Sequence, residues 1–145
     1  MCRKVFMFSL VSLLFLYSEQ PSYASLFEEV SIEIAGKVIE VEVATTEVQR
    51  NLGLSSRPRT STKYFMLFVF DAPQQVSFWM KDTNRDLSIA FVDKKNKVIQ
   101  IENLKARSLK TVQSKSTQIK YALEVPRGYF AKNNIKIGDN LLFID

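Results

Sequence analysis

Apolar and polar residues alternate in the part of the chain that follows residue 25. Apolar side chains occupy every second position over residues 30–34 and again over 39–43, and Ala35 and Gly36 lie between the two runs. Because successive side chains of a strand point to opposite faces of a sheet, a period of two predicts strands with one buried face. Two such runs joined by a short glycine-containing turn predict a β-hairpin.

Two short helices are predicted from their boundary residues. Thr46 and Gln49 have the spacing of a capping box, so a helix should begin at Glu47. Gly53 is placed to end this helix in the left-handed conformation. A second short helix is predicted through residues 129–131, directly after a Pro-Arg-Gly turn.

Further strands are predicted from apolar runs that are bounded by turn residues, at residues 64–70, 76–81, 87–92, 98–101, 119–125 and 141–144. Residues 103–118 carry few large apolar side chains, which predicts a long surface loop with at most one irregular strand. About eight strands and two short helices predict a mainly β (α+β) fold, a compact barrel or a folded antiparallel sheet. We expect a single domain over residues 25–145.

The first 24 residues have the three regions of a secretory signal peptide. Arg3 and Lys4 precede an apolar run over residues 5–17, and Ser22-Tyr23-Ala24 supplies small residues for cleavage. A membrane-spanning helix needs about 20 apolar residues, so this run is short for a permanent anchor. We therefore predict cleavage before Ser25, no stable membrane span afterwards, and an exported protein in the periplasm or outside the cell. An uncleaved anchor is the alternative.

Composition narrows the chemistry that the domain can perform. The chain has no histidine, and its one cysteine, Cys2, lies in the predicted signal peptide. These two facts exclude Cys–His and Ser–His–Asp catalysis and zinc sites built on imidazole or thiolate in the mature domain. Without residues 1–24 the formal net charge falls from +5 to +4, a surplus too small and dispersed for nucleic acid. We predict no cofactor and no nucleic-acid partner.

Four segments together resemble a known family. They are residues 41–54 with Glu47, Arg50 and Gly53-Leu54, the run Met-Leu-Phe-Val-Phe at 66–70, the block Phe78-Trp79-Met80-Lys81 with Thr83 and Ile-Ala-Phe-Val-Asp at 89–93, and Tyr-Ala-Leu-Glu-Val at 121–125 with Gly128 and Ile-Gly-Asp at 137–139. In this order they resemble DUF192, also called UPF0127, a family of small, often exported, uncharacterised bacterial and archaeal domains. The resemblance implies fold and location, and no activity is established for the family as a whole.

Polar or amphipathic residues inside these segments are the candidate ligand-binding residues: Arg50, Arg57, Trp79, Lys81, Thr83 and Glu124. In a structural interpretation, Glu124 pairs with Arg50 or Lys81, Trp79 fills the barrel and Thr83 caps a turn. In a functional interpretation, the six line the barrel mouth, where Arg and Lys receive an anionic group and Trp79 stacks on a sugar or aromatic ring. Alternation along 78–81 predicts that Phe78 and Met80 are buried while Trp79 and Lys81 face an opening.

Acidic residues raise two further possibilities, a metal site and acid–base catalysis. Residues 82–86 match the start of a calcium loop with Asp93 at its twelfth position, but Leu87 stands where the sharp turn needs glycine. A charged turn is therefore preferred, and no metal is predicted. Asp82, Asp86, Asp93 and Glu124 contain a possible catalytic pair, although exposed turn acids are the default. No catalytic residue is assigned.

These observations lead to one hypothesis for the function and one alternative. The preferred hypothesis is an exported, non-enzymatic binding or accessory domain of the cell envelope, which recognises a small or polymeric envelope ligand through a pocket near Trp79 and Lys81. The alternative is a carboxylate-dependent hydrolase that acts on an envelope glycan. The absence of histidine and cysteine from the mature domain favours the binding hypothesis.

Overall fold

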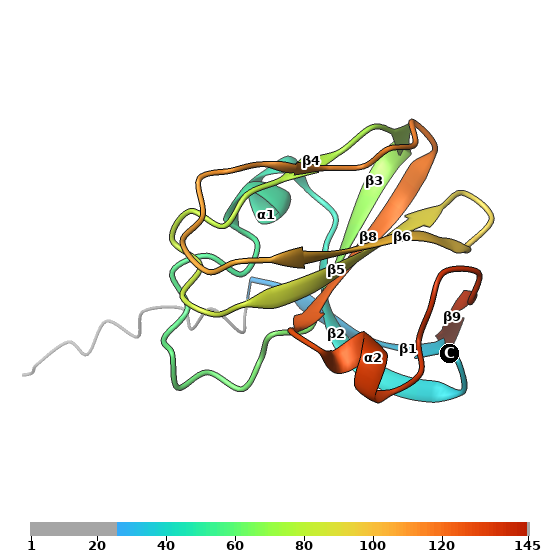
Figure 1. Ribbon diagram of the computed structural model, residues 1–145, viewed down its shortest axis with the longest axis horizontal. Coiled ribbons are helices and arrows are strands. Elements are labelled where there is room, and N and C mark those ends of the chain that lie inside the picture. Colours follow the sequence, from blue (N-terminus) through green and yellow to red (C-terminus); the bar gives the residue numbers. More distant parts are fainter. Residues whose placement is uncertain (1–25, 145) are drawn as a thin grey trace, which may run out of the picture.

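A computed structural model describes residues 26–144; the predicted signal peptide, with Cys2 and its cleavage site before Ser25, lies outside these described residues. The described part of the chain forms nine strands and two helices (Figure 1). The strands are β1 (Glu28–Ile34), β2 (Lys37–Ala44), β3 (Met66–Gln74), β4 (Ser77–Phe78), β5 (Leu87–Asp93), β6 (Val98–Leu104), β7 (Val112–Gln113), β8 (Ile119–Pro126) and β9 (Leu141–Ile144). The helices are α1 (Glu47–Leu52) and α2 (Tyr129–Lys132).

Seven of the strands form one sheet in the order β6-β5-β8-β3-β2-β1-β9, and β4 pairs with β7 in a separate two-stranded sheet. The large sheet curls, because an isolated bridge between Lys97 and Asn140 brings the two edge strands β6 and β9 together. The backbone N–H of Leu141 adds a hydrogen bond of 2.8 Å to the carbonyl of Asn96. The predicted mainly β fold with a curled sheet and two short helices is confirmed.

The N-terminal hairpin forms as predicted. The register pairs Ile34 with Lys37, which leaves Ala35 and Gly36 as a two-residue turn. Both residues have positive φ, 50° and 72°, as a tight hairpin turn requires. Glycine adopts this conformation at little cost, so Gly36 is well suited to its place.

Helix α1 begins where its sequence predicts, and both hydrogen bonds of the capping box are present between Thr46 and Gln49. Gly53 ends the helix with φ 50° and ψ −136°, so the predicted left-handed helical conformation is wrong in its ψ angle. A side chain at this position would place its Cβ 3.3 Å from the Phe68 ring. Glycine therefore lets the end of α1 approach the sheet closely.

One strand prediction is wrong. Within residues 76–81 only Ser77 and Phe78 are strand, and they pair with Gln113 and Val112 of the segment that was predicted to be mainly loop. This segment does not join the seven-stranded sheet, because it crosses over one face of that sheet as part of a cover. The ring of Phe78 nevertheless packs edge-on against Phe68 of β3, with centroids 4.9 Å apart.

The side chains of the large sheet divide between two faces with different cores. The inner face is lined from all seven strands by an apolar cluster that includes Ile32, Val41, Leu67, Val92, Val98, Leu123 and Leu141. Helix α2 contributes Phe130 to this cluster. The opposite side, which we call the cleft face, carries Met66, Phe68, Ile89, Phe91 and Ala122. It is covered by Leu52 of α1 and by Phe78 and Val112 of the small sheet.

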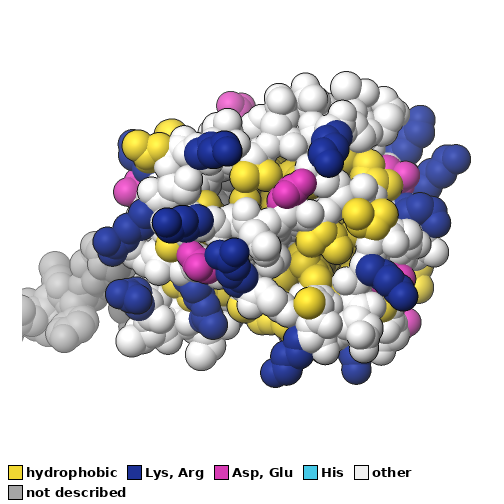
Figure 2. Space-filling view, viewed as in Figure 1, with side chains coloured by type: hydrophobic (Ala, Val, Ile, Leu, Met, Phe, Trp, Pro, Cys, Tyr) yellow, Lys and Arg dark blue, Asp and Glu magenta, His cyan; other side chains and the backbone are white. Residues whose placement is uncertain are grey.

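The surface has no concentrated patch of positive charge on the side drawn in Figure 2. Lys and Arg side chains are scattered over this face. No helix within residues 26–144 is long and apolar enough to cross a membrane.

Candidate functional site

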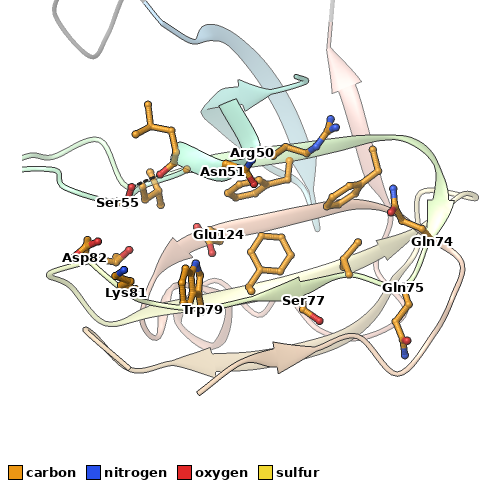
Figure 3. A pocket seen from close by; sticks show the side chains of 18 residues that line it. Arg50, Asn51, Ser55, Gln74, Gln75, Ser77, Trp79, Lys81, Asp82 and Glu124 are labelled. Atoms are coloured by element: carbon orange, nitrogen blue, oxygen red, sulfur yellow. Dashed lines mark hydrogen bonds between the residues drawn. The ribbon is translucent and has the colours of Figure 1, made fainter. Parts of the chain in front are cut away.

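The cover of the cleft face leaves an open cleft with a volume of about 440 Å³ (Figure 3). The end of α1 and the residues after it form one wall, and the segment around β4 forms the other. Phe68, Phe70 and Glu124 lie between the two walls. The residues with polar groups that line the cleft are Arg50, Asn51, Ser55, Gln74, Gln75, Ser77, Trp79, Lys81, Asp82, Thr83 and Glu124.

Backbone hydrogen bonds fix the wall around β4. The N–H of Ser114 donates to the carbonyl of Val76, and the buried hydroxyl of Ser114 accepts from the N–H of Val76 at 3.0 Å. Further along, the N–H of Met80 donates to the carbonyl of Ser108, and the N–H of Arg107 donates to that of Thr83. The long segment between β6 and β8 therefore holds one wall of the cleft in place.

Trp79 and Lys81 form a platform at the rim of the cleft. Trp79 is 55% exposed, and the Nζ atom of Lys81 lies 5.5 Å from the centroid of its ring. Met80 is buried and Lys81 is exposed, as predicted, whereas Phe78 is only half-buried and is the only one of residues 78–81 that belongs to a strand. The interpretation in which Trp79 fills a barrel is wrong, because its side chain is mostly outside the core.

Arg50 lines the cleft but is committed to local contacts. Its guanidinium donates to the carbonyls of Thr45 and Val69, and it lies 5.6 Å from the centroid of the Phe70 ring. Its nearest acid is Asp71, at 3.8 Å. Arg50 therefore holds α1 against β3 and leaves little of its hydrogen-bonding capacity for a ligand.

Arg57 does not join the other candidates in the cleft. Its side chain is 4% exposed, and its NH1 group contacts the Oε2 atom of Glu42 at 2.5 Å and the carbonyl of Lys63 at 2.8 Å. Glu42 is buried as well. Within residues 26–144, the Nε and NH2 groups of Arg57 have no hydrogen-bond partner. This pair is an ion pair inside the core beside the cleft.

Glu124 lies on the cleft face of β8, with Met66 of β3 and Ile89 of β5 as its direct neighbours across the sheet. Its side chain is 4% exposed. Burial raises the pKa of this carboxyl to about 8, and the charge of Arg57 opposes the rise. The predicted pairing of Glu124 with Arg50 or Lys81 is wrong: the ion pairs among the described residues join other partners.

Thr83 and Asp82 end the wall that carries the platform. Thr83 is buried, lines the cleft, and closes a turn through its N–H, which donates to the carbonyl of Met80 at 3.0 Å. Asp82 has a positive φ of 61°, and its carbonyl accepts from the N–H of Ser56 on the opposite wall at 2.7 Å. This bond joins the two walls at one end of the cleft.

The remaining acids of the possible calcium loop hold turns elsewhere. Asp86 accepts hydrogen bonds from the N–H of Ala106 and the guanidinium of Arg127, which hold its pKa below the usual range. Asp93 accepts from the backbone N–H groups of Lys95 and Lys97. The part of the chain described here contains no group of three or more His, Cys, Asp or Glu residues placed to bind a metal ion.

Of the six candidates, the structure brings Arg50, Trp79, Lys81, Thr83 and Glu124 to one cleft and places Arg57 outside it. The cleft lies on the face of the sheet opposite the inner face, so the expected position at a barrel mouth is wrong. Several polar residues of the walls were not among the predicted ligand-binding residues, namely Asn51, Ser55, Gln74, Gln75 and Ser77. The Gln-Gln pair directly after a buried strand was the signal that could have found part of this set.

The fold and the cleft define a small, mainly β domain with an open, aromatic-lined pocket outside its curled sheet. The chain belongs to the DUF192 family, whose model, described as "Uncharacterized ACR, COG1430", matches residues 30–143. A comparison with curated proteins gives no match.

Two solved structures are similar to this chain. One is a protein of unknown function from Novosphingobium aromaticivorans, with 25% identity, a TM-score of 0.74, and coverage of 84% of this chain and 89% of that one. The other comes from Sinorhizobium meliloti and carries the provisional description of a transcription regulator. It has 25% identity, a TM-score of 0.72, and coverage of 81% and 95%.

Proposed function

We propose that this domain binds a sugar unit that bears an acidic group, and that it does so as an exported binding domain of the cell envelope. The observation that carries this proposal is the platform of Trp79 and Lys81 at the rim of an open cleft. A flat aromatic ring can stack on the apolar face of a sugar ring, and the neighbouring ammonium can bind a carboxylate.

The polar wall residues favour a sugar over an aromatic acid. The side-chain amides of Asn51, Gln74 and Gln75 and the hydroxyls of Ser55 and Ser77 line the cleft around its aromatic residues. Amides and hydroxyls both donate and accept, so they suit the many hydroxyl groups of a sugar.

Binding is tested by thermal shift and calorimetry with D-glucuronate, with D-glucose as the neutral match and benzoate as the aromatic acid. D-Glucuronate should raise the unfolding temperature, since a ligand that prefers the native state stabilises it. Lys81→Ala should weaken D-glucuronate binding about tenfold, as loss of a charged hydrogen bond does, and leave D-glucose binding unchanged. Trp79→Ala should weaken both.

Matched controls exist for both variants. Lys94→Ala removes an exposed lysine from the turn after β5, and Phe143→Ala removes a partly exposed aromatic ring from β9. Both controls should bind like the wild type. Unchanged binding in Trp79→Ala and Lys81→Ala would place the site elsewhere, and a shift with benzoate alone would replace the sugar by an aromatic acid.

Export rests on the sequence of residues 1–24. Fused to a reporter enzyme that is active only outside the cytoplasm, these residues should give activity. N-terminal sequencing of the secreted product should begin at Ser25, and a product that still begins at Met1 would favour an uncleaved anchor.

Hydrolysis of a glycan is the second candidate, and it is favoured by two acids in the same cleft. Glu124 is a buried carboxyl with a raised pKa, and Asp82 is an exposed acidic side chain on the wall. One buried and one exposed acidic side chain in the same cleft are typical of the acid–base pairs of glycosidases. Release of reducing ends from a uronate-containing glycan, lost in both Glu124→Gln and Asp82→Asn, would establish it; no release by the wild type would exclude it for that glycan.

A further inference from the structure

The Glu124 carboxyl lies in the middle of the cleft without a partner of its own. Figure 3 shows it between the two walls, on the sheet side of the cavity and near Trp79. Among residues 26–144, no hydrogen bond or ion pair joins its carboxyl oxygens to another residue, and these oxygens are not among the fully buried side-chain atoms that lack a partner, so they open onto the cleft. Because no group of the described chain occupies these oxygens, they are free to bond to whatever fills the cleft, and a mostly buried polar group at the floor of a cleft is typical of a ligand site.

Charged groups surround this carboxyl from each side. Those that lie around it on the neighbouring elements are Arg50 from α1, Arg57 from the loop that follows, Glu42 from β2, and Lys81 and Asp82 from the segment after β4. Its direct neighbours, Met66 and Ile89, are uncharged. The nearby Arg57 is already bound to Glu42, and Arg50 is bound to backbone carbonyls. The surroundings thus leave Glu124 without a cation in contact.

A mostly buried carboxyl without a contacting cation keeps its proton at neutral pH, because burial leaves too little water around it to solvate the charge well. The raised pKa of Glu124, about 8, agrees with this reasoning. A protonated carboxyl has one O–H donor in addition to its acceptor oxygen. When a ligand fills the cleft and displaces water, that donor needs an acceptor atom on the ligand.

We propose that Glu124 binds the sugar as a neutral carboxylic acid, donating a hydrogen bond to an acceptor oxygen of the ring substituents. This inference rests on the proposed function and deepens it, because it states which chemistry the centre of the cleft selects. A sugar with hydroxyl or carboxylate oxygens satisfies the donor. A sugar with an ammonium group presents only donors there, so it can bond to Glu124 only if the carboxyl gives up its proton.

The test uses Glu124→Gln and Glu124→Ala and measures binding of D-glucuronate, D-glucose and D-glucosamine by calorimetry between pH 6 and pH 9.5. The amide of Gln has nearly the shape of the acid and keeps an N–H donor at every pH. Glu124→Gln should therefore bind D-glucuronate within about threefold of the wild type, whereas Glu124→Ala should bind it about tenfold more weakly.

The pH dependence separates the proton from the shape of the side chain. Wild-type affinity for D-glucuronate should be flat at neutral pH and fall about tenfold for each pH unit above the pKa of Glu124, because ionisation removes the donor and adds a repulsive charge. Glu124→Gln should lack this fall. Circular dichroism at each pH confirms that both variants are folded.

Two results would overturn the inference while leaving the proposed function in place. One is D-glucuronate binding that is lost equally in Glu124→Gln and Glu124→Ala. The other is tighter binding of D-glucosamine than of D-glucuronate, which would make Glu124 an ionised acceptor. If the folded wild type binds none of the three sugars, the proposed function itself fails and the inference falls with it.

Discussion

The two faces of the seven-stranded sheet are built from the same strands, but they differ in how many charged groups they bury. The inner face is an apolar cluster to which every strand of the sheet contributes. On the cleft face, the row across β2, β3, β8 and β5 reads Glu42, Met66, Glu124 and Ile89, so two buried carboxyl groups interrupt the apolar surface. Both faces contain an apolar core, and only the cleft face also contains the ion pair and the cleft.

The buried charged groups of the cleft face contribute less to stability than apolar packing would. A buried ion pair is weak evidence for stability, since apolar residues of similar size often replace one without loss. An unpartnered buried acid such as Glu124 destabilises the fold when it ionises. Both features lie on the side that holds the cleft, which is the arrangement that the proposed binding site would require.

The largest effect is expected at the buried ion pair. Arg57→Met leaves Glu42 as an uncompensated buried charge and should lower the free energy of unfolding by about 3 to 5 kcal/mol in urea titrations. Arg57→Met combined with Glu42→Met should recover most of this loss. Arg127→Met, which breaks the exposed pair with Asp86, is the control and should barely change the unfolding midpoint. If the double variant is as unstable as Arg57→Met alone, the pair is a net stabilising element and the comparison of faces fails.

A core truncation on the inner face comes next. Leu123→Ala removes a fully buried side chain from β8, an interior strand of the sheet, and should lower the free energy of unfolding by about 3 kcal/mol. Leu142→Ala, on the exposed side of β9, is the matched control and should cost a small fraction of that. A loss below about 1 kcal/mol for Leu123→Ala would mean that the inner face is not the main core.

Glu124 should make stability depend on pH. Its carboxyl titrates near 4.5 when unfolded and at about 8 in the folded protein, so between these values the folded state holds the extra proton. Stability therefore falls as pH rises through this window, by up to about 1.4 kcal/mol per pH unit from this group. Urea titrations at pH 5, 6, 7 and 8 should show the slope in the wild type and a weaker slope in Glu124→Gln. Equal slopes would contradict the raised pKa.

The smallest stability effect is expected at the platform. Trp79→Ala and Lys81→Ala change exposed side chains and should each lower the free energy of unfolding by less than about 1 kcal/mol. The same titrations as for Leu123→Ala measure this. Strong destabilisation by both variants, with unchanged affinity per folded molecule, would make these residues part of the core.

Much of the fold followed from short stretches of sequence. The hairpin turn at Ala35 and Gly36 and the cap of α1 at Thr46 and Gln49 involve residues within four positions of one another, so the local pattern contained the whole interaction. The strand at 76–81 was predicted from the same kind of pattern and was mostly wrong. Its backbone groups pair with Ser108, Val112 and Ser114, which lie far along the chain. The alternation of nearby residues cannot predict such distant partners.

The candidate site divides in the same way. Exposure of Trp79 and Lys81 followed from the sequence, because alternation places the two on one face and the charge of Lys81 is costly to bury without a partner. The ion pair between Arg57 and Glu42 could not be predicted from the sequence. Glu42 lies on a different element, and the two residues meet only when the loop after α1 folds over β2.

The sequence by itself determined the period of the strands, the hairpin, the start of α1, the outward direction of Trp79 and Lys81, and the membership in DUF192, because each depends on neighbours in the chain or on its residue pattern. Only the tertiary structure decided that the cleft lies outside the curl of the sheet and that Glu124 is buried there beside, but not in contact with, a paired arginine. The protonation of a carboxyl depends on solvent exclusion and on nearby charges from several elements, and these exist only after the chain has folded.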